Sequence, residues 1–120
     1  MRMTEMEFEG QRPVDGYGPG GFRVGGDWHD GSLLLLPSGM EPLAGSLSVE
    51  ALRPVLDADD PVDVLLIGMG PEIAPLPRPV RAALDEAGIG AEVMSTPAAC
   101  RTYNVLLVEA RRVAAALVAL

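Results

Sequence analysis

A run of apolar residues that ends in a glycine turn most constrains how this chain folds. Its sequence is Val62-Asp63-Val64-Leu65-Leu66-Ile67-Gly68-Met69-Gly70-Pro71. Residues 64–67 carry no polar side chain, so both faces of a strand formed here must be covered by other parts of the chain. We therefore expect a central strand with layers on both sides of its sheet. Gly68 and Gly70 allow the backbone to leave the sheet sharply and leave room above the carboxyl end of the strand.

The length and composition of the chain indicate one domain with a large core. The 120 residues suffice for a single hydrophobic core, so we expect one domain over residues 1–120. Hydrophobic residues make up 48% of the chain, but no apolar run approaches the ~20 residues of a transmembrane helix. We expect a protein that does not span a membrane and that has an apolar contact surface, either for a protein partner or for a homo-oligomer.

Cysteine and histidine counts restrict the chemistry of the chain. Cys100 is the only cysteine, which excludes an internal disulfide, and His29 is the only histidine, which excludes zinc sites built from clustered Cys and His. We expect no metal and no cofactor. The amino terminus has neither the pattern of a secretory signal nor that of a transit peptide, so a cytoplasmic protein is predicted. Nine arginines and no lysine indicate a GC-rich bacterial genome.

Negative charge is concentrated in the first half of the chain. Residues 1–63 hold 12 acidic side chains and 4 arginines, whereas residues 64–120 hold 5 of each, and the net charge is −8. A surface of this sign repels nucleic acid and anionic lipid, so we expect no nucleic-acid binding. The charge either favours a basic partner or simply keeps an apolar domain in solution.

The first half is expected to hold an N-terminal β-hairpin region. Short apolar runs predict strands over residues 22–24 and 32–37, with Asp30-Gly31 as the tight turn between them. Trp28-His29 then lies at the hairpin tip or just before it, either as a contact patch or packed on the domain edge. The glycine-rich residues 10–21 predict an irregular loop, with Tyr17 at its centre, that either runs over the surface or serves as a lid over a site.

Shorter elements are expected on either side of this region. Alternating polarity predicts a strand over residues 6–9, and a further extended piece covers residues 40–43. Ser48 is suited to cap a helix over residues 49–56, which Pro54 kinks or shortens.

The second half alternates helices and strands, which predicts a partly parallel sheet with helices packed against it. The expected elements are a helix over residues 79–87 that ends at Gly88, a strand over 91–95, a helix over 98–109 that Thr96-Pro97 opens, and a strand over 112–120. The alanines of the last segment favour a helix, but a second helix directly after the first would need a break, so we expect a strand.

Gly68-Met69-Gly70 resembles the start of a dinucleotide-binding fingerprint. The third glycine of that motif would fall at Ile73, and a proline-rich loop over residues 71–77 follows in place of a helix. A tight turn that clears space is therefore the better interpretation.

The predicted helix start at Thr96 offers two interpretations. Free N–H groups and the helix dipole favour an anion there, or else Thr96 merely caps the helix. Cys100, beside Arg101, has a lowered pKa if it is exposed, or else it is a buried structural cysteine. No proton-transfer set of the Ser-His-Asp or paired-carboxylate type is present, so no catalytic residue is predicted.

Arg101, Tyr103 and Asn104 supply hydrogen-bonding groups close to this helix start. They either point into the space above Gly68 or fix the helix to the sheet and loop. Together the candidate residues for binding a ligand or partner are Gly68, Met69, Gly70, Thr96, Cys100, Arg101, Tyr103 and Asn104.

Several segments together resemble one known family, a small domain of unknown function found in bacteria and archaea. Its eukaryotic members include mitochondrial respiratory complex I assembly factor 3 and an adipogenesis-associated protein. The segments are Asp15-Gly16-Tyr17-Gly18, Gly20-Gly21-Phe22-Arg23, Gly31-Ser32-Leu33-Leu34-Leu35-Leu36-Pro37, Val64 to Gly70, Thr96-Pro97-Ala98-Ala99-Cys100-Arg101-Thr102-Tyr103-Asn104, Glu109 and Arg111. The resemblance spans nearly the whole chain, and the segment from Thr96 to Asn104 is its specific part.

The resemblance implies an α/β fold of three layers around a central mixed sheet, with flanking helices and a strand at the carboxyl terminus. Ala110 stands where the family usually has glycine, and a left-handed alanine there would cost roughly 1 kcal/mol. The mitochondrial relative implies a non-catalytic interaction protein that assembles respiratory complex I or another membrane complex. The alternative is a small-ligand or anion-binding protein, or an enzyme, with a pocket at Gly68–Gly70 and Thr96.

Overall fold

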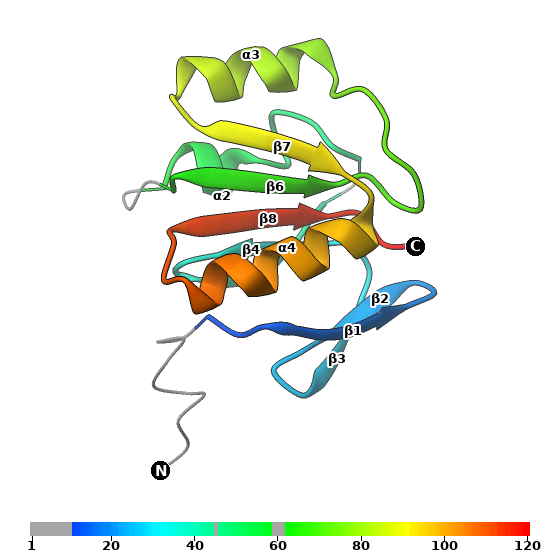
Figure 1. Cartoon of the computed structure of the whole chain (residues 1–120). Helices are drawn as coiled ribbons and strands as arrows, with labels where there is room; N and C mark the ends of the chain where they lie inside the picture. The colour runs from blue at the N-terminus through cyan, green and yellow to red at the C-terminus, as the bar shows by residue number, and fades with distance from the viewer. Residues whose placement is uncertain (1–10, 45, 59–61) are drawn as a thin grey trace.

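The computed structural model describes residues 11–44, 46–58 and 62–120. Within these ranges, eight strands form two sheets, and three helices accompany them (Figure 1). In chain order the elements are β1 (Val14–Gly18), β2 (Gly21–Val24), β3 (Asp27–Asp30), β4 (Leu33–Leu36), β5 (Gly39–Pro42), α2 (Arg53–Leu56), β6 (Val64–Gly68), α3 (Arg78–Glu86), β7 (Gly90–Met94), α4 (Thr96–Val108) and β8 (Val113–Leu117). The strand predicted over residues 6–9 lies outside the described residues.

The larger sheet has five strands in the order β5-β4-β8-β6-β7. β6 pairs in parallel with β7 on one side and with β8 on the other, and β4 pairs antiparallel with β8 and β5. This internal position explains why β6 carries no polar side chain: Leu65, Leu66 and Ile67 are all 0% exposed. The central strand predicted over residues 64–67 is confirmed, and so is the carboxyl-terminal strand, which forms β8.

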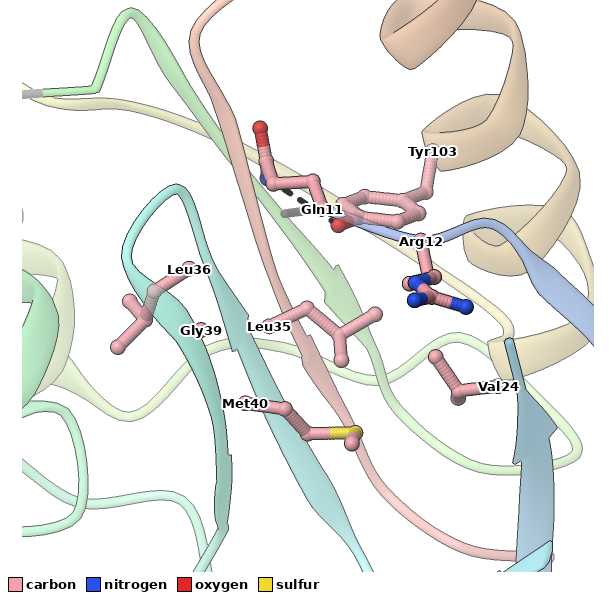
Figure 2. A pocket seen from close by; sticks show the side chains of 8 residues that line it. All are labelled: Gln11, Arg12, Val24, Leu35, Leu36, Gly39, Met40 and Tyr103. Atoms are coloured by element: carbon pink, nitrogen blue, oxygen red, sulfur yellow. Dashed lines mark hydrogen bonds between the residues drawn. The ribbon is translucent and has the colours of Figure 1, made fainter. Parts of the chain in front are cut away.

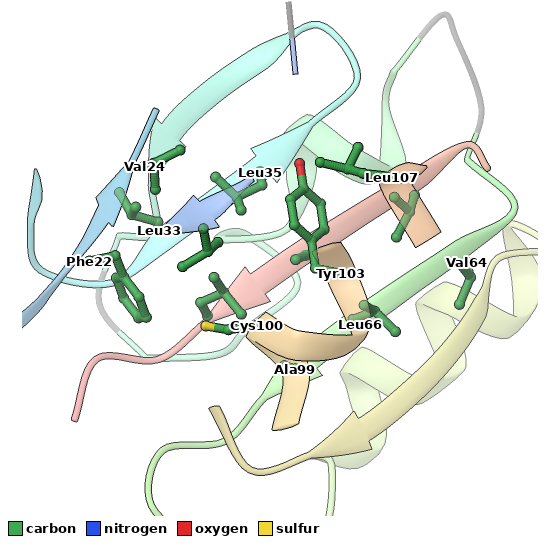
Figure 3. Close-up of a cluster of buried hydrophobic side chains, with 14 residues drawn as sticks. Phe22, Val24, Leu33, Leu35, Val64, Leu66, Ala99, Cys100, Tyr103 and Leu107 are labelled. Atoms are coloured by element: carbon green, nitrogen blue, oxygen red, sulfur yellow. The ribbon is translucent and has the colours of Figure 1, made fainter. Parts of the chain in front are cut away.

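Alternating side chains of the larger sheet build a hydrophobic core on each of its faces. Val64 and Leu66 face α4 and the smaller sheet, in the cluster drawn in Figure 3. Leu65 and Ile67 lie on the opposite face, in a cluster that includes buried residues of α2 and α3. Helices therefore cover both faces of a mixed sheet, which confirms the α/β fold of three layers (Figure 1).

The smaller sheet, in the order β1-β2-β3, shows that the predicted hairpin between residues 22–24 and 32–37 is wrong. β2 turns through Gly25-Gly26 into β3, and β1 pairs with its other edge. The two glycines have φ of 59° and 90°, and a two-residue hairpin turn favours positive φ at both central positions. The buried run of β4 lies between β5 and β8 instead, where both of its faces are covered.

β1 replaces part of the irregular loop predicted over residues 10–21. Val14–Gly18 is a strand despite its two glycines, because it pairs with β2 from Val14 to Gly18 with one register shift. Tyr17 thus lies in a strand rather than on a lid, and Trp28 and His29 lie in β3 rather than at a hairpin tip.

Two of the predicted helices are confirmed, and a third is shorter than expected. α3 ends before Gly88, whose φ is 74°, and α4 is followed by Ala110 at φ 59°. Ser48 Oγ accepts a hydrogen bond from Ala51 N at 3.0 Å, but residues 49–52 form turns, and α2 begins only at Arg53. Pro54 lies in the first turn of α2, where its missing N–H breaks no helical hydrogen bond.

Candidate functional site

The turn after β6 and the start of α4 meet, as predicted from the sequence. β6 and β7 are adjacent parallel strands, and Gly68 is in register with Met94 at their carboxyl ends. Met69 N donates to Met94 O at 2.8 Å, and Thr96 N donates to Gly70 O at 2.7 Å. The candidate residues 68–70 and Thr96 are therefore neighbours in the fold.

The space expected above Gly68 is filled, so the prediction of a crevice at this point is wrong. A Cβ atom on Gly68 would lie 2.9 Å from both Cα and Oγ1 of Thr96, and 3.2 Å from Cβ of Ala99. Thr96 itself is 0% exposed. Gly68 therefore allows the first turn of α4 to pack directly on the end of β6, which is a close-approach role for glycine rather than a space-clearing one.

The Thr96 hydroxyl joins three segments that are distant in the sequence. Its Oγ1 accepts a hydrogen bond from Gly70 N at 2.8 Å and donates one to Val118 O at 2.7 Å. The helix cap is supplied by Ser95 instead, whose side chain accepts from Ala98 N at 3.4 Å. The prediction that Thr96 caps the helix is thus wrong by one residue. Thr96 instead connects the segments that follow β6 and β8 to the start of α4.

The start of α4 has its N–H groups engaged within the protein. Thr96 N donates to Gly70 O, Ala98 N donates to Ser95 Oγ, and Ala99 N donates to Ser95 O at 2.9 Å. Pro97 has no N–H group. An anion at this helix start would have to displace these bonds, so the geometry does not favour the anion-binding interpretation.

Cys100 is a buried residue of the core rather than a reactive thiol. It is 3% exposed and faces the cluster of Figure 3. Burial raises the pKa of its thiol from 9.0 to about 11, although the nearby Arg101 guanidinium opposes the shift. The thiol therefore stays protonated at neutral pH, whereas nucleophilic attack needs the thiolate.

Tyr103 and Asn104 fix α4 to the amino-terminal segment and do not face Gly68. The Tyr103 hydroxyl accepts a hydrogen bond from Gln11 Nε2 at 3.2 Å, and burial raises the pKa of Tyr103 to about 12. The Asn104 amide donates to Val14 O at 2.9 Å and accepts from Val14 N at 2.8 Å, as a neighbouring strand would. Among the candidate side chains, that of Arg101 is left exposed on α4.

A small cavity lies beside Tyr103, next to the β4–β5 edge of the larger sheet. It has a volume of about 140 Å³ and is lined by Gln11, Arg12, Val24, Leu35, Leu36, Gly39, Met40 and Tyr103 (Figure 2). Ligand pockets usually measure ~300–1,000 Å³, so this cavity has room for a few waters or one small group rather than a metabolite.

A larger hollow adjoins the loop between β6 and α3, which sequence reasoning did not single out. It measures about 390 Å³ and is lined by Ile73, Ala74, Pro75, Leu76, Arg81 and Val93. Ile73 is 66% exposed at its rim. Its lining is apolar apart from Arg81 and offers no acid–base pair, so it suits an apolar group better than a reaction. The exposed isoleucine within a proline-rich loop was the signal available in the sequence.

No group of three or more His, Cys, Asp or Glu side chains is placed to hold a metal ion in the described part of the chain. None of its helices combines the length and apolarity that crossing a membrane requires.

Similar proteins point to one family. Residues 14–118 match the family model described as "Protein of unknown function (DUF498/DUF598)". An uncharacterised protein of Rhodobacter capsulatus is 47% identical over 98% of this chain and 92% of its own length. A crystal structure described as an outer membrane protein from Bartonella henselae has 44% identity and a TM-score of 0.88, and the match covers 93% of this chain and 98% of that one.

A vertebrate relative carries a functional name. It is NADH dehydrogenase [ubiquinone] 1 alpha subcomplex assembly factor 3 from Danio rerio, which is 36% identical over 85% of this chain. The match covers 61% of the length of that relative, so the chain spans about three fifths of it. The fold, the matched residues and these identities agree with one another, and the chain belongs to the DUF498/DUF598 family.

Proposed function

We propose that the protein is a non-catalytic interaction protein of the cytoplasm that helps to assemble respiratory complex I or another membrane complex. The observation that carries this proposal is the contrast between its polar and apolar groups. The polar groups of Thr96, Tyr103 and Asn104 are bonded within the protein. On the outer side of α4, by contrast, Val105 is 56% exposed and Val108 is 75% exposed.

The outer side of α4 supplies a contact surface of the expected kind. Arg101, Val105 and Val108 follow one another at helical spacing, so their side chains share one face of the helix. Exposed apolar side chains beside one charge are typical of a protein–protein contact. Arg101 is therefore the member of the predicted candidate set that we retain as a partner-binding residue.

The name of the Danio rerio relative supports assembly as the role. The match covers most of this chain but only three fifths of that relative. Assembly of a complex requires protein contacts, and the exposed apolar side chains of α4 offer one. The anion-binding or enzymatic alternative at Gly68–Gly70 and Thr96 has no comparable support, because the hydrogen-bond donors there are already engaged.

Affinity purification of the tagged protein from its host, followed by mass spectrometry, tests the proposal. We expect the wild-type protein to enrich subunits of complex I or of another membrane complex. Val108→Glu should reduce this enrichment about tenfold, since it places a charge in an apolar contact. Ala82→Glu, on the exposed side of α3, is the matched control and should leave it unchanged.

Arg101→Ala and Asn104→Ala separate partner binding from structure. Arg101→Ala should weaken partner enrichment while the melting temperature stays unchanged, whereas Asn104→Ala should lower the melting temperature by several degrees. The proposal is wrong if no membrane-complex subunit is enriched above an unrelated tagged protein, or if a bound metabolite is recovered in stoichiometric amount.

A further inference from the structure

We propose that the outer face of the smaller sheet docks an arginine-bearing segment of a partner protein, with the guanidinium stacked on the indole of Trp28. This face belongs to β1, β2 and β3, and β3 is an edge strand of its sheet. Figure 1 shows the smaller sheet beside α4 and far from α3. The inference rests on the proposed interaction function and names the chemistry of one partner.

The Trp28 ring lies against the backbone of two glycines, Gly21 and Gly18. A Cβ atom on Gly21 would come within 2.7 Å of the Trp28 ring atom Cζ2 and 3.0 Å of Cε2, and a Cβ atom on Gly18 would lie 3.6 Å from Cη2. The ring therefore extends from β3 across β2 toward β1, with one side against the backbone. Any side chain at Gly21 would clash with the backbone oxygen of His29 as well as with the ring, so the glycine permits the close approach of both.

The indole is also fixed at its edge, and its outward side remains open. Its Nε1 donates a hydrogen bond to Asp30 Oδ1 at 2.9 Å, while Trp28 as a whole is 44% exposed. Arg23 stands opposite Trp28 in the β2–β3 register. Its Nη1 donates to Gly26 O at 3.3 Å, which draws the Arg23 side chain toward the β2–β3 turn. A rigid aromatic side chain loses little conformational freedom when a partner binds, which is typical of binding hot spots.

The carboxylate of Asp30 at the ring edge and the acidic balance of the first half of the chain favour a cationic occupant. Asp15, Asp27 and Asp30 are exposed in this sheet, against the cation of Arg23 and that of Arg12, whose side chain lies against Gly25. The net charge of −8 also arises entirely within residues 1–63. A cation over the face of tryptophan is attracted by the ring. Asp30 lies at the ring edge, and its second carboxylate oxygen can accept a further hydrogen bond.

Arginine fits this arrangement better than lysine. Its planar guanidinium can stack flat on the indole and still direct N–H groups at a carboxylate in the plane of the stack. An ammonium group is compact and strongly hydrated, so it gains less from the flat surface. The same negative charges exclude nucleic acid and anionic lipid as occupants.

Peptide titrations test the proposal directly, because Trp28 is the only tryptophan in the chain and its fluorescence reports on the site. The probes are three short peptides of one length that contain two arginines, two lysines or two citrullines, the neutral analogue of arginine. We expect saturable changes in Trp28 fluorescence with the arginine peptide, at a dissociation constant of about 1 mM or tighter. The lysine peptide should bind more weakly, and the citrulline peptide at least about fivefold more weakly.

Two matched variants separate a site from general attraction between opposite charges. Asp30→Asn and Asp63→Asn remove the same charge from two exposed positions, one at the ring and one before β6. Asp30→Asn should weaken arginine-peptide binding at least about fivefold, and Asp63→Asn less than about twofold. Calorimetry on Trp28→Leu, which keeps an apolar cover over Gly21, should find no binding of the arginine peptide.

Three results would overturn the proposal. They are the absence of saturation by the arginine peptide, equal binding of the citrulline peptide, and equal weakening by the two Asp→Asn variants. Because these titrations use isolated peptides, they succeed or fail independently of whether the purified protein enriches membrane-complex subunits.

Discussion

At the scale of single residues, buried and partly buried polar groups of this protein connect distant segments of the chain. The hydroxyl of Thr96 connects the turn after β6 with the end of β8, and the amide of Asn104 connects α4 with β1. Each of these groups has both a donor and an acceptor in use, as burial requires. Removing such a group leaves its partners without a hydrogen bond inside the protein, which costs more than the bond itself contributes.

Thr96→Val should therefore lower the free energy of unfolding by about 1–3 kcal/mol, because the N–H of Gly70 and the carbonyl of Val118 lose their partner. Thr102→Val is the control, since the Thr102 hydroxyl donates only to Ala98 O of its own helix, at 2.9 Å. It should change stability by less than about 0.5 kcal/mol. Chemical denaturation compares the two, and equal losses would show that the Thr96 tie is not special.

Burial of Cys100 predicts a pH dependence of stability. Because the pKa of the folded thiol is raised from 9.0 to about 11, the unfolded chain loses this proton first as the pH rises. The contribution is complete below pH 9 and is lost as the pH rises toward 11. Between pH 9 and 10 the wild-type protein should lose about 1 kcal/mol from this group. Denaturation of Cys100→Ala should have a flatter profile over this interval, and an unchanged slope would contradict the assignment.

At the scale of elements, the fold depends on β6 and on the turns that redirect the chain. β6 contributes side chains to the hydrophobic clusters on both faces of the larger sheet. α4 covers one of these faces and is followed by Ala110 in a left-handed conformation, at φ 59°. The backbone N–H groups of Ala110 and Arg111 bond back to Leu107 O and Leu106 O, so the turn is held in place despite its unfavourable residue.

Leu66→Ala should destabilise the protein by about 2–5 kcal/mol, because the side chain is 0% exposed and its removal leaves a cavity beneath α4. Val105→Ala shortens an exposed apolar side chain and should cost less than about 0.5 kcal/mol. Urea denaturation measures both. A loss below about half a kcal/mol for Leu66→Ala would contradict the central position of β6.

Ala110→Gly should stabilise the protein by roughly 1 kcal/mol, since glycine adopts positive φ without the steric strain of a Cβ atom. Ala87 follows α3 at φ −79°, where alanine is unstrained. Ala87→Gly should therefore destabilise the protein by roughly 0.5–1 kcal/mol. Thermal unfolding distinguishes the two substitutions by the opposite signs of their shifts in melting temperature.

At the scale of the whole molecule, charge and apolar surface determine which partners can bind. The negative charge arises in the first half of the chain, whose described residues form the smaller sheet, α2 and one edge of the larger sheet. The exposed apolar side chains of α4 lie in the second half, which has no net charge. The two proposed contacts therefore lie on separate surfaces, one acidic and aromatic and the other apolar.

The absence of nucleic-acid binding is accordingly a prediction for the whole molecule. At low salt, titration of a labelled oligonucleotide with the protein should show no binding at micromolar concentrations, because a net charge of −8 repels phosphate. Saturable micromolar binding that weakens as salt is added would contradict it.

Local patterns were sufficient for several parts of the fold. The unbroken apolar run of residues 64–67 predicted a strand covered on both faces, and Gly88 predicted the end of α3. The meeting of the Gly68 turn with the start of α4 followed from parallel neighbouring strands. The resemblance to the family also identified Ala110 as a strained position. Each of these depends on backbone preferences or on burial of a strand, and both can be inferred from a few consecutive residues.

Pairing and orientation were decided only by the tertiary structure. Asp30-Gly31 and Gly25-Gly26 both suit a hairpin turn, and the choice between them depended on β4 finding two covered faces in the larger sheet. The glycine-rich strand β1 exists because β2 and the Asn104 amide bond to its backbone.

The candidate site shows the same division. Residue types and spacing correctly predicted that Gly68 and Thr96 are neighbours. Whether the space between them is open depends on how closely α4 approaches β6. Packing of the helix against the sheet set this approach, and it placed Thr96 and Ala99 where the crevice was expected. Which parts of the backbone turn and which strands are buried could be predicted from consecutive residues, because those properties are local. Which strands pair and which polar groups bond to each other was settled only in the folded protein, because these depend on residues as many as 102 positions apart.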